Sequence, residues 1–230
     1  MQLDNVKLYN ELKRKGINYL YHANTLITSL SFIELGGITS RGRIEKLGLQ
    51  QTPQNSDYID KKYDIWNDIF LDTTDLHNYS YSGWYRQNLY GPILFELKTE
   101  LLIDDNLNNI WITTNNPTNW RSNTSENYFT NVDEYIMNID TNRQQKMITI
   151  RGEDKIVPFE NYLNCIYIDN PYIKYDGIKL YEFCYNKICK SLNKNGIYTS
   201  VLEHSCNQNC YCRENYLHMM SYELEKLFLI

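Results

Sequence analysis

The sequence lacks long apolar runs, an excess of positive charge and paired C-x-x-C motifs. No apolar stretch approaches the roughly 20 residues of a membrane span, and residues 1–15 contain no apolar core of a secretory signal. The 23 lysines and arginines are outnumbered by 28 acidic residues, which gives a formal net charge of −5. Since a protein that coats nucleic acid needs a positive field, such a role is disfavoured. We expect a cytoplasmic protein with no membrane partner.

The composition is that of a globular protein, with 42% hydrophobic and 22% charged residues. A chain of 230 residues can bury a substantial core, and we find no internal repeat or hinge. Six cysteines without an export signal are more typical of reduced thiols or metal ligands than of disulfides. We therefore predict a single domain over residues 1–230, in which residues 197–230 form a cysteine-rich C-terminal cap.

Apolar periodicity predicts helices interspersed with strands. Helices are expected at residues 6–15, 25–35, 132–138, 177–193 and 216–229. Strands are expected at residues 17–22, 68–74, 91–102, 147–150, 165–169 and 197–202. Their irregular spacing indicates an α+β or mixed-sheet fold rather than regular βαβ units. The polar stretch 40–68 is predicted as a long loop, and loops of this length are more often functional than idle.

Three stretches, taken in order, resemble proteins of the ADP-ribosyltransferase fold. The first is LYHANT at residues 20–25, followed by a helix and the turn at residues 36–38. The second is the strand pair at 68–74 and 91–102, and the third is IVPFE at 156–160, which runs into the strand at 165–169. The set is similar to DarT-type DNA ADP-ribosyltransferases and RNA 2′-phosphotransferases. The resemblance implies an α+β fold with a split mixed sheet and flanking helices.

The resemblance also implies NAD as the cofactor and assigns roles to the first of these stretches. His22 would hydrogen-bond a ribose hydroxyl of NAD, with Tyr21, Asn24 and Thr25 beside it and Gly37 in the following turn. The alternative is a half-buried histidine whose ring is satisfied by a neighbouring backbone group. The ordered set of stretches favours the nucleotide-binding interpretation.

Two arginines stand at the start of the polar loop. The resemblance implies that an arginine there closes over NAD, and a guanidinium suits a pyrophosphate because it donates two parallel hydrogen bonds. We place Arg41 with the NAD-binding residues and Arg43 with the catalytic ones. Spacing does not decide which of the two serves, and the alternative for each is an exposed surface arginine.

The glutamate that the resemblance implies is missing from its expected position. In such enzymes a carboxylate near the start of the strand before the Val-Pro element stabilises the positive ribose. If Gln145 holds the polar position of that strand, Met147 stands where the glutamate belongs. Glu160 and Glu203 are the candidate replacements, although Glu160 could instead face water or cap its helix. Either the acid comes from an unusual position or the site binds nucleotide without turnover.

A cysteine cluster near the C-terminus is the second candidate site. Cys206, Cys210 and Cys212, with His218 six residues further on, have the donor types that tetrahedral zinc favours. Their spacing is not that of a standard zinc finger. The alternative is a set of packed, reduced thiols.

Together these features predict an NAD-dependent ADP-ribosyltransferase, a toxin or defence effector that modifies nucleic acid or protein. Two alternatives stay open: a catalytically inactive NAD- or ADP-ribose-binding module of the same fold, and a zinc-stabilised interaction protein.

Overall fold

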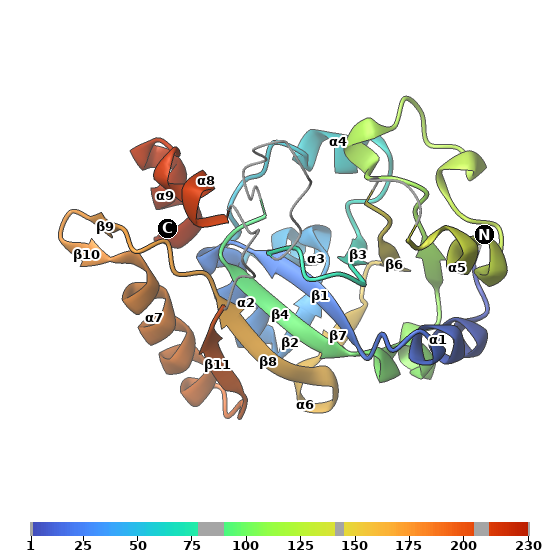
Figure 1. The fold of residues 1–230 in the computed structure, drawn as a ribbon, viewed down its shortest axis with the longest axis horizontal. Coiled ribbons are helices and arrows are strands. Elements are labelled where there is room, and N and C mark those ends of the chain that lie inside the picture. Colours follow the sequence, from blue (N-terminus) through green and yellow to red (C-terminus); the bar gives the residue numbers. More distant parts are fainter. Residues whose placement is uncertain (1, 78–89, 141–144, 205–211, 230) are drawn as a thin grey trace.

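The structure is a computed structural model that describes residues 2–77, 90–140, 145–204 and 212–229. Its centre is a four-stranded sheet in the order β1-β4-β8-β11 (Figure 1). The strands are β1 (Tyr19–Asn24), β4 (Ile93–Lys98), β8 (Leu163–Ile168) and β11 (Ser200–Glu203). The first three are antiparallel neighbours, and β11 runs parallel to β8. The expectation of an α+β fold with a mixed sheet is confirmed.

The register of these strands brings four chain segments to one edge of the sheet. Asn24 at the end of β1 pairs with Ile93 at the start of β4. Ile93 pairs with Ile168 at the end of β8, and Ile168 pairs with Glu203 at the end of β11. The residues that enter or leave the strands at this edge therefore lie close together, although they are distant in sequence.

Three smaller sheets accompany the central one in the described part of the chain. The first is antiparallel, in the order β3 (Asp68–Leu71), β6 (Ile148–Arg151) and β5 (Ile110–Ile112). The second pairs β2 (Gly37–Thr39) with β7 (Ile156–Pro158), and the third is a short hairpin of β9 (Lys174–Tyr175) and β10 (Ile178–Lys179). A bridge between Tyr21 and Asp72 links β1 to the end of β3 through two backbone hydrogen bonds of 2.8 and 2.9 Å.

Helices surround the sheets, and α2 packs against α7. The α-helices are α1 (Asn5–Arg14), α2 (Leu26–Leu35), α3 (Arg41–Lys46), α4 (Asp57–Lys62), α5 (Val132–Asn138), α6 (Phe159–Tyr162), α7 (Leu180–Lys194), α8 (Cys212–Leu217) and α9 (Ser221–Phe228). Short 3-10 helices are η1 (Thr99–Ile103), η2 (Asp105–Leu107), η3 (Pro117–Asn119) and η4 (Ser125–Asn127). Within the ranges that the structure describes, no helix is long and apolar enough to cross a membrane.

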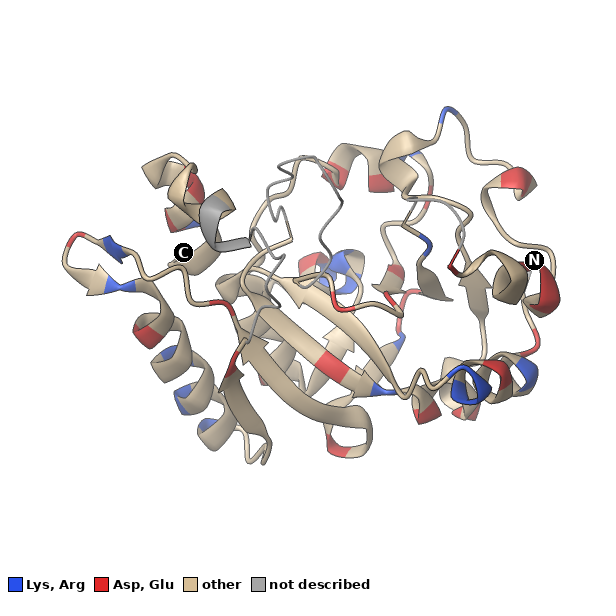
Figure 2. Cartoon of the chain, in the orientation of Figure 1, with Lys and Arg blue, Asp and Glu red and all other residues tan. Residues whose placement is uncertain are grey.

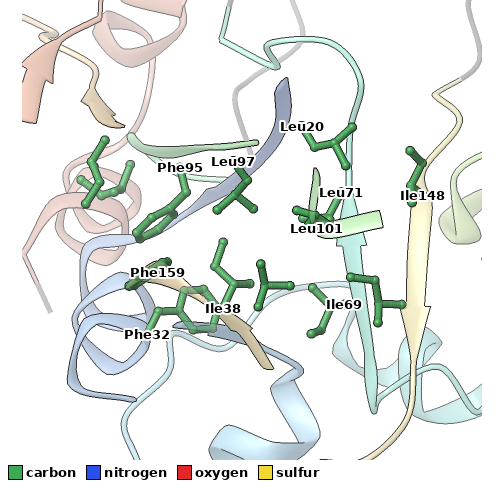
Figure 3. Close-up of a cluster of buried hydrophobic side chains, with 14 of the residues drawn as sticks. Leu20, Phe32, Ile38, Ile69, Leu71, Phe95, Leu97, Leu101, Ile148 and Phe159 are labelled. Carbon is green, nitrogen blue, oxygen red and sulfur yellow. The ribbon is translucent and has the colours of Figure 1, made fainter. Parts of the chain in front are cut away.

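The main hydrophobic core lies between one face of the central sheet and the elements packed on it (Figure 3). Phe95 of β4 stacks on Phe159 of α6 with ring centroids 5.3 Å apart, and meets Phe32 of α2 edge-on at 6.0 Å. Strands β2 and β3 add Ile38 and Ile69, which are almost fully buried. Aromatic pairs in these offset and edge-on arrangements stabilise a core beyond the area they bury.

Several expected elements differ in their bounds. The predicted loop at 40–68 contains α3 and α4, whose six residues each are too few to show an apolar stripe. The predicted strand at 91–102 ends at Lys98, and a 3-10 helix follows. Val157 and Pro158, for which no strand is predicted, lie in β7, where they pair with Ile38 and Gly37. The single helix expected at 216–229 is divided into α8 and α9.

Candidate functional site

A buried carboxylate lies in the middle of the central sheet, on the face opposite the main core. Side chains alternate along a strand, so the core-facing Phe95 leaves Glu96 on the other face. There Glu96 pairs in register with Tyr21 on one side and Cys165 on the other. Glu96 is 6% exposed. Its Oε1 accepts hydrogen bonds from Asn164 Nδ2 at 2.6 Å and from Cys165 Sγ at 3.4 Å.

The groups around Glu96 are held in their neutral forms. Burial and the nearby Glu96 carboxylate raise the pKa of the Tyr21 hydroxyl above its ordinary value. Burial raises the pKa of the Cys165 thiol to about 11. Since the reactive form of cysteine is the thiolate, Cys165 acts here as a hydrogen-bond donor rather than as a nucleophile.

A second buried carboxylate, Asp72, reaches Tyr21 through the backbone bridge between them. Burial raises the pKa of Asp72 to about 7, and Gln145 Nε2 donates to its Oδ1 at 3.0 Å. Gln145 Oε1 in turn accepts from the Tyr90 hydroxyl at 2.7 Å and from Asn116 Nδ2 at 2.8 Å. Gln145, which lies two residues before the buried Met147, therefore contacts a carboxylate that the sequence pattern did not predict.

His22 faces the side of the sheet opposite to Tyr21 and is half-buried. Its Nδ1 lies 2.9 Å from the carbonyl oxygen of Phe70, and its Nε2 lies 3.3 Å from Asn24 Nδ2. Because a carbonyl only accepts, Nδ1 carries the proton and Nε2 accepts from the amide. Burial lowers the pKa of His22 to about 4, so the ring is neutral at physiological pH. The alternative interpretation of His22 expects a backbone group to satisfy its ring, and the Phe70 carbonyl is such a group. The contact of His22 with a ribose hydroxyl of NAD stays a prediction.

Asn24 and Thr25 connect β1 to α2 at the edge of the sheet. Thr25 is the N-cap of α2, and its hydroxyl donates to Thr52 Oγ1 at 2.7 Å. Asn24 Oδ1 accepts from the Thr25 amide at 2.9 Å. Gly91 approaches so closely that a Cβ on it would lie 2.4 Å from the Asn24 carbonyl oxygen. The backbone at this corner is therefore tightly packed.

Of the two candidate arginines, Arg41 lies nearer to His22, where its charge helps to lower the pKa of the ring. Its Nη2 donates to Asp57 Oδ2 at 3.0 Å and to the Thr52 carbonyl at 3.0 Å, and its Nε lies 2.9 Å from Asp57 Oδ1. Its side chain is 14% exposed, so Arg41 is held in an ion pair with Asp57. Arg43 donates instead to the carbonyl oxygen of Asp154.

The remaining predicted residues are more scattered. Glu160 is exposed on α6, and Glu203 is exposed at the end of β11, where it accepts from Asn170 and Tyr172 at 3.1 and 3.0 Å. Gly37 lies in β2, close to the backbone of β7. A Cβ at this position would lie 2.5 Å from the Val157 carbonyl oxygen, so only glycine fits.

The predicted zinc cluster falls mostly outside the described residues. Cys206 and Cys210 lie within 205–211, and Cys212 begins α8 with a side chain that is also outside the description. His218 is exposed just after α8. The predicted set of four ligands therefore stays a prediction.

A cluster of buried histidines and aspartates occupies the edge of the central sheet. His77 Nδ1 lies 2.9 Å from Asp169 Oδ1, and His204 Nδ1 lies 3.4 Å from the same oxygen. The outer nitrogen of each ring is also engaged: His77 Nε2 is 3.0 Å from the Gly91 carbonyl, and His204 Nε2 is 2.9 Å from Asp75 Oδ2. His77, Asp169 and His204 offer donor atoms that all lie within 4.8 Å of one another.

The surroundings within the cluster stabilise the charged forms of His77 and Asp75. Burial disfavours a charged imidazole, but the Asp169 carboxylate raises the pKa of His77 above its ordinary value. Burial also disfavours the Asp75 carboxylate, but its hydrogen bond to His204 lowers its pKa. Sequence reasoning missed His77 and Asp169; the available signal was that Asp169 and His204 each directly follow a strand.

Comparison with protein-family models found no family that matches the chain, and a search of curated proteins found no match.

Proposed function

We propose that this protein is an NAD-dependent ADP-ribosyltransferase in which Glu96 supplies the carboxylate that stabilises the reacting ribose. The observation that carries the proposal is the position of Glu96, a buried acid in the middle of the sheet and directly across from Tyr21. In Figure 2 it is the acidic position within β4. Burying a carboxylate is unfavourable, so the position of Glu96 is not explained by packing alone.

The chemistry needs a negative charge beside the ribose. The bond between nicotinamide and ribose C1′ breaks with its electron pair on the departing nicotinamide, which leaves positive charge on the ribose. A nucleophile of the acceptor then forms a bond to C1′ and loses its proton. A carboxylate fixed near C1′ stabilises the positive intermediate state, and a water-poor site strengthens that interaction.

The residues around Glu96 suit this task. Asn164 and Cys165 both donate to the same carboxylate oxygen and so hold the group in one orientation. The half-buried Tyr21 offers a flat ring on which a nicotinamide could stack beside Glu96. Because Tyr21 and His22 face opposite sides of the strand, we place the nicotinamide on the Tyr21 side. Asn24, which the resemblance also associates with NAD, lies on the His22 side, where its Nδ2 is 3.3 Å from His22 Nε2.

The test compares wild-type protein with Glu96→Gln, which keeps the size of the side chain and an oxygen that can accept the hydrogen bonds from Asn164 and Cys165. Nicotinamide release from labelled NAD is measured with DNA, RNA and protein acceptors, and NAD binding is measured by calorimetry. We expect release to fall by about 100-fold or more, the usual effect of losing one preorganised electrostatic group, with little change in NAD affinity. Glu126→Gln, on an exposed 3-10 helix, is the matched control and should keep full activity.

Each other outcome excludes a different part of the proposal. Wild-type protein that neither binds nor cleaves NAD with any acceptor would rule out the function. Binding without nicotinamide release would favour the inactive nucleotide-binding module, for which Met147 in place of the expected glutamate is the specific observation. Loss of activity in Glu160→Gln or Glu203→Gln, but not in Glu96→Gln, would show that the acid was assigned to the wrong residue.

A further inference from the structure

We propose that His77, His204 and Asp169 form a zinc site at the edge of the central sheet, separate from the cysteine cluster predicted from the sequence. The three side chains come from chain positions far apart, yet their donor atoms lie within 4.8 Å of one another. All three residues are buried. This inference does not depend on the proposed transferase activity.

The hydrogen bonds of the two histidines determine which ring nitrogen is available. Gly91 presents a carbonyl oxygen to His77 Nε2, and Asp75 presents a carboxylate oxygen to His204 Nε2. Both partners only accept, so each Nε2 carries its proton. In a neutral imidazole the other nitrogen, Nδ1, then has a lone pair.

Both Nδ1 atoms converge on one oxygen, Asp169 Oδ1, at 2.9 and 3.4 Å. A lone pair and a carboxylate oxygen repel each other at this distance, so positive charge has to lie between them. Protons would require two charged imidazoles whose ring centroids are 5.1 Å apart in a buried place, His77 and His204. One divalent cation satisfies both nitrogens and the carboxylate together, which is why we favour a metal ion over two protons.

The donors favour zinc over calcium and magnesium. Two imidazoles and one carboxylate form a typical three-residue zinc set, whereas calcium and magnesium prefer oxygen ligands. Zinc bound at about 2.0–2.2 Å holds tetrahedral ligand atoms about 3.4 Å apart, and the distances from Asp169 Oδ1 are already close to this value. Three protein ligands leave the fourth coordination position for a water or a further group.

The surrounding hydrogen bonds hold the ligands in position. Asp75 accepts from His204, and the Gly91 carbonyl accepts from His77, as the outer partners of metal-binding histidines commonly do. The Tyr216 hydroxyl donates to the other Asp169 oxygen, Oδ2, at 2.5 Å. The Asp169 amide also donates to the Pro92 carbonyl oxygen at 2.9 Å. A metal here would join the segments that follow β3, β8 and β11 to α8.

The first experiment measures metal in the full-length protein. Protein purified without chelator should contain about one zinc per chain by elemental analysis. After zinc is removed, titration with Co²⁺ should give the visible absorption of a four-coordinate site, with one equivalent bound. His77→Gln and Asp169→Asn, which preserve approximate side-chain size, should lose this absorption and most of the zinc. His218→Ala, which changes an exposed histidine after α8, should keep both.

Two further variants keep the proposal testable if a ligand variant fails to fold. Asp75→Asn leaves all three ligands in place and should weaken Co²⁺ affinity by about 10- to 100-fold, the usual effect of losing an outer partner. A variant with Cys206, Cys210 and Cys212 all changed to serine should retain the metal.

The proposal is overturned if wild-type protein binds neither zinc nor Co²⁺, since the cluster is then a buried, protonated ion-pair network. It is equally overturned if the metal is lost in the serine variant and retained in His77→Gln. Unchanged Co²⁺ affinity in Asp75→Asn would contradict the assigned orientation of His204.

Discussion

Replacing Asp72 with asparagine should stabilise the protein at pH 8 and leave its stability nearly unchanged at pH 4. Asp72 is 6% exposed, and burial raises its pKa from an ordinary value of 3.8 to about 7. Between these two values the folded protein holds a proton that the unfolded chain releases. Stability therefore falls as pH rises through this range.

The magnitude follows from the difference between the two pKa values. A difference of roughly three corresponds to about 4 kcal/mol, which is the full destabilisation by Asp72 once the pH exceeds its folded pKa. Asparagine cannot ionise, and its Oδ1 can still accept from Gln145. The free energy of unfolding of Asp72→Asn, minus that of wild type, should thus rise from about zero at pH 4 toward this limit at pH 8. Differences cancel the contributions of other titrating groups.

Urea denaturation followed by circular dichroism at half-unit pH steps measures this difference. Asp133→Asn is the control, because Asp133 pairs with Lys7 at the surface and is 65% exposed. Exposed ion pairs contribute about 0–1 kcal/mol, so the control should show a small and nearly flat difference. A flat profile for Asp72→Asn, or a loss of stability at pH 8, would refute the assigned burial of the carboxylate charge.

Two further predictions concern the corner next to His22. Gly91→Ala should lower the free energy of unfolding by about 2 kcal/mol or more. A Cβ at Gly91 would lie 2.4 Å from the Asn24 carbonyl oxygen, and the backbone has φ +116° there. Gly48→Ala is the control: it has open space around it, so its positive φ alone should lower the free energy of unfolding by about 1 kcal/mol. Arg41→Ala should destabilise by about 3–5 kcal/mol, because it leaves the Asp57 carboxylate without its charged partner. Thermal and urea unfolding measure the stability of all three variants. Equal losses of stability in the two glycine variants would contradict the close packing at Gly91. A loss of less than about 1 kcal/mol in Arg41→Ala would contradict the burial of its ion pair.

The strands of the central sheet could be predicted from sequence because each is a short apolar run bounded by polar residues. Strand β4 illustrates both the success and the limit. Its apolar run predicts the strand, but nothing in the run marks Glu96 as a candidate acid. The position of Glu96 follows from the alternation of side chains: Phe95 and Leu97 face the core, so Glu96 occupies the other face.

The histidine–aspartate cluster could not be predicted in the same way. Asp169 and His204 meet because β8 and β11 are parallel neighbours that end at the same edge, and His77 reaches them from a segment after β3. Local sequence patterns carry no information about which strands become neighbours. The cysteine spacing near residue 206 indicates a local cluster, whereas the buried His77, Asp169 and His204 are brought together only by the sheet order.

The two polar sites lie on adjoining parts of the sheet, and their tests can still be separated. Tyr167 lies two residues after Cys165 on β8, on the same face as Glu96, and its ring meets His204 edge-on with centroids 5.9 Å apart. The Asp75 carboxylate helps to raise the pKa of Tyr21 as well as that of Tyr167.

Glu96 is nevertheless held by partners within β8, Asn164 and Cys165, which contact no metal-binding side chain of the proposed zinc site in the described part of the chain. Glu96→Gln should therefore retain its zinc while losing NAD cleavage, because the substitution leaves the edge of the sheet intact. His77→Gln should lose zinc. Any fall in NAD cleavage in this variant would then measure how much the position of Tyr21 depends on the edge of the sheet. Loss of zinc in Glu96→Gln would show that the two sites form one connected unit.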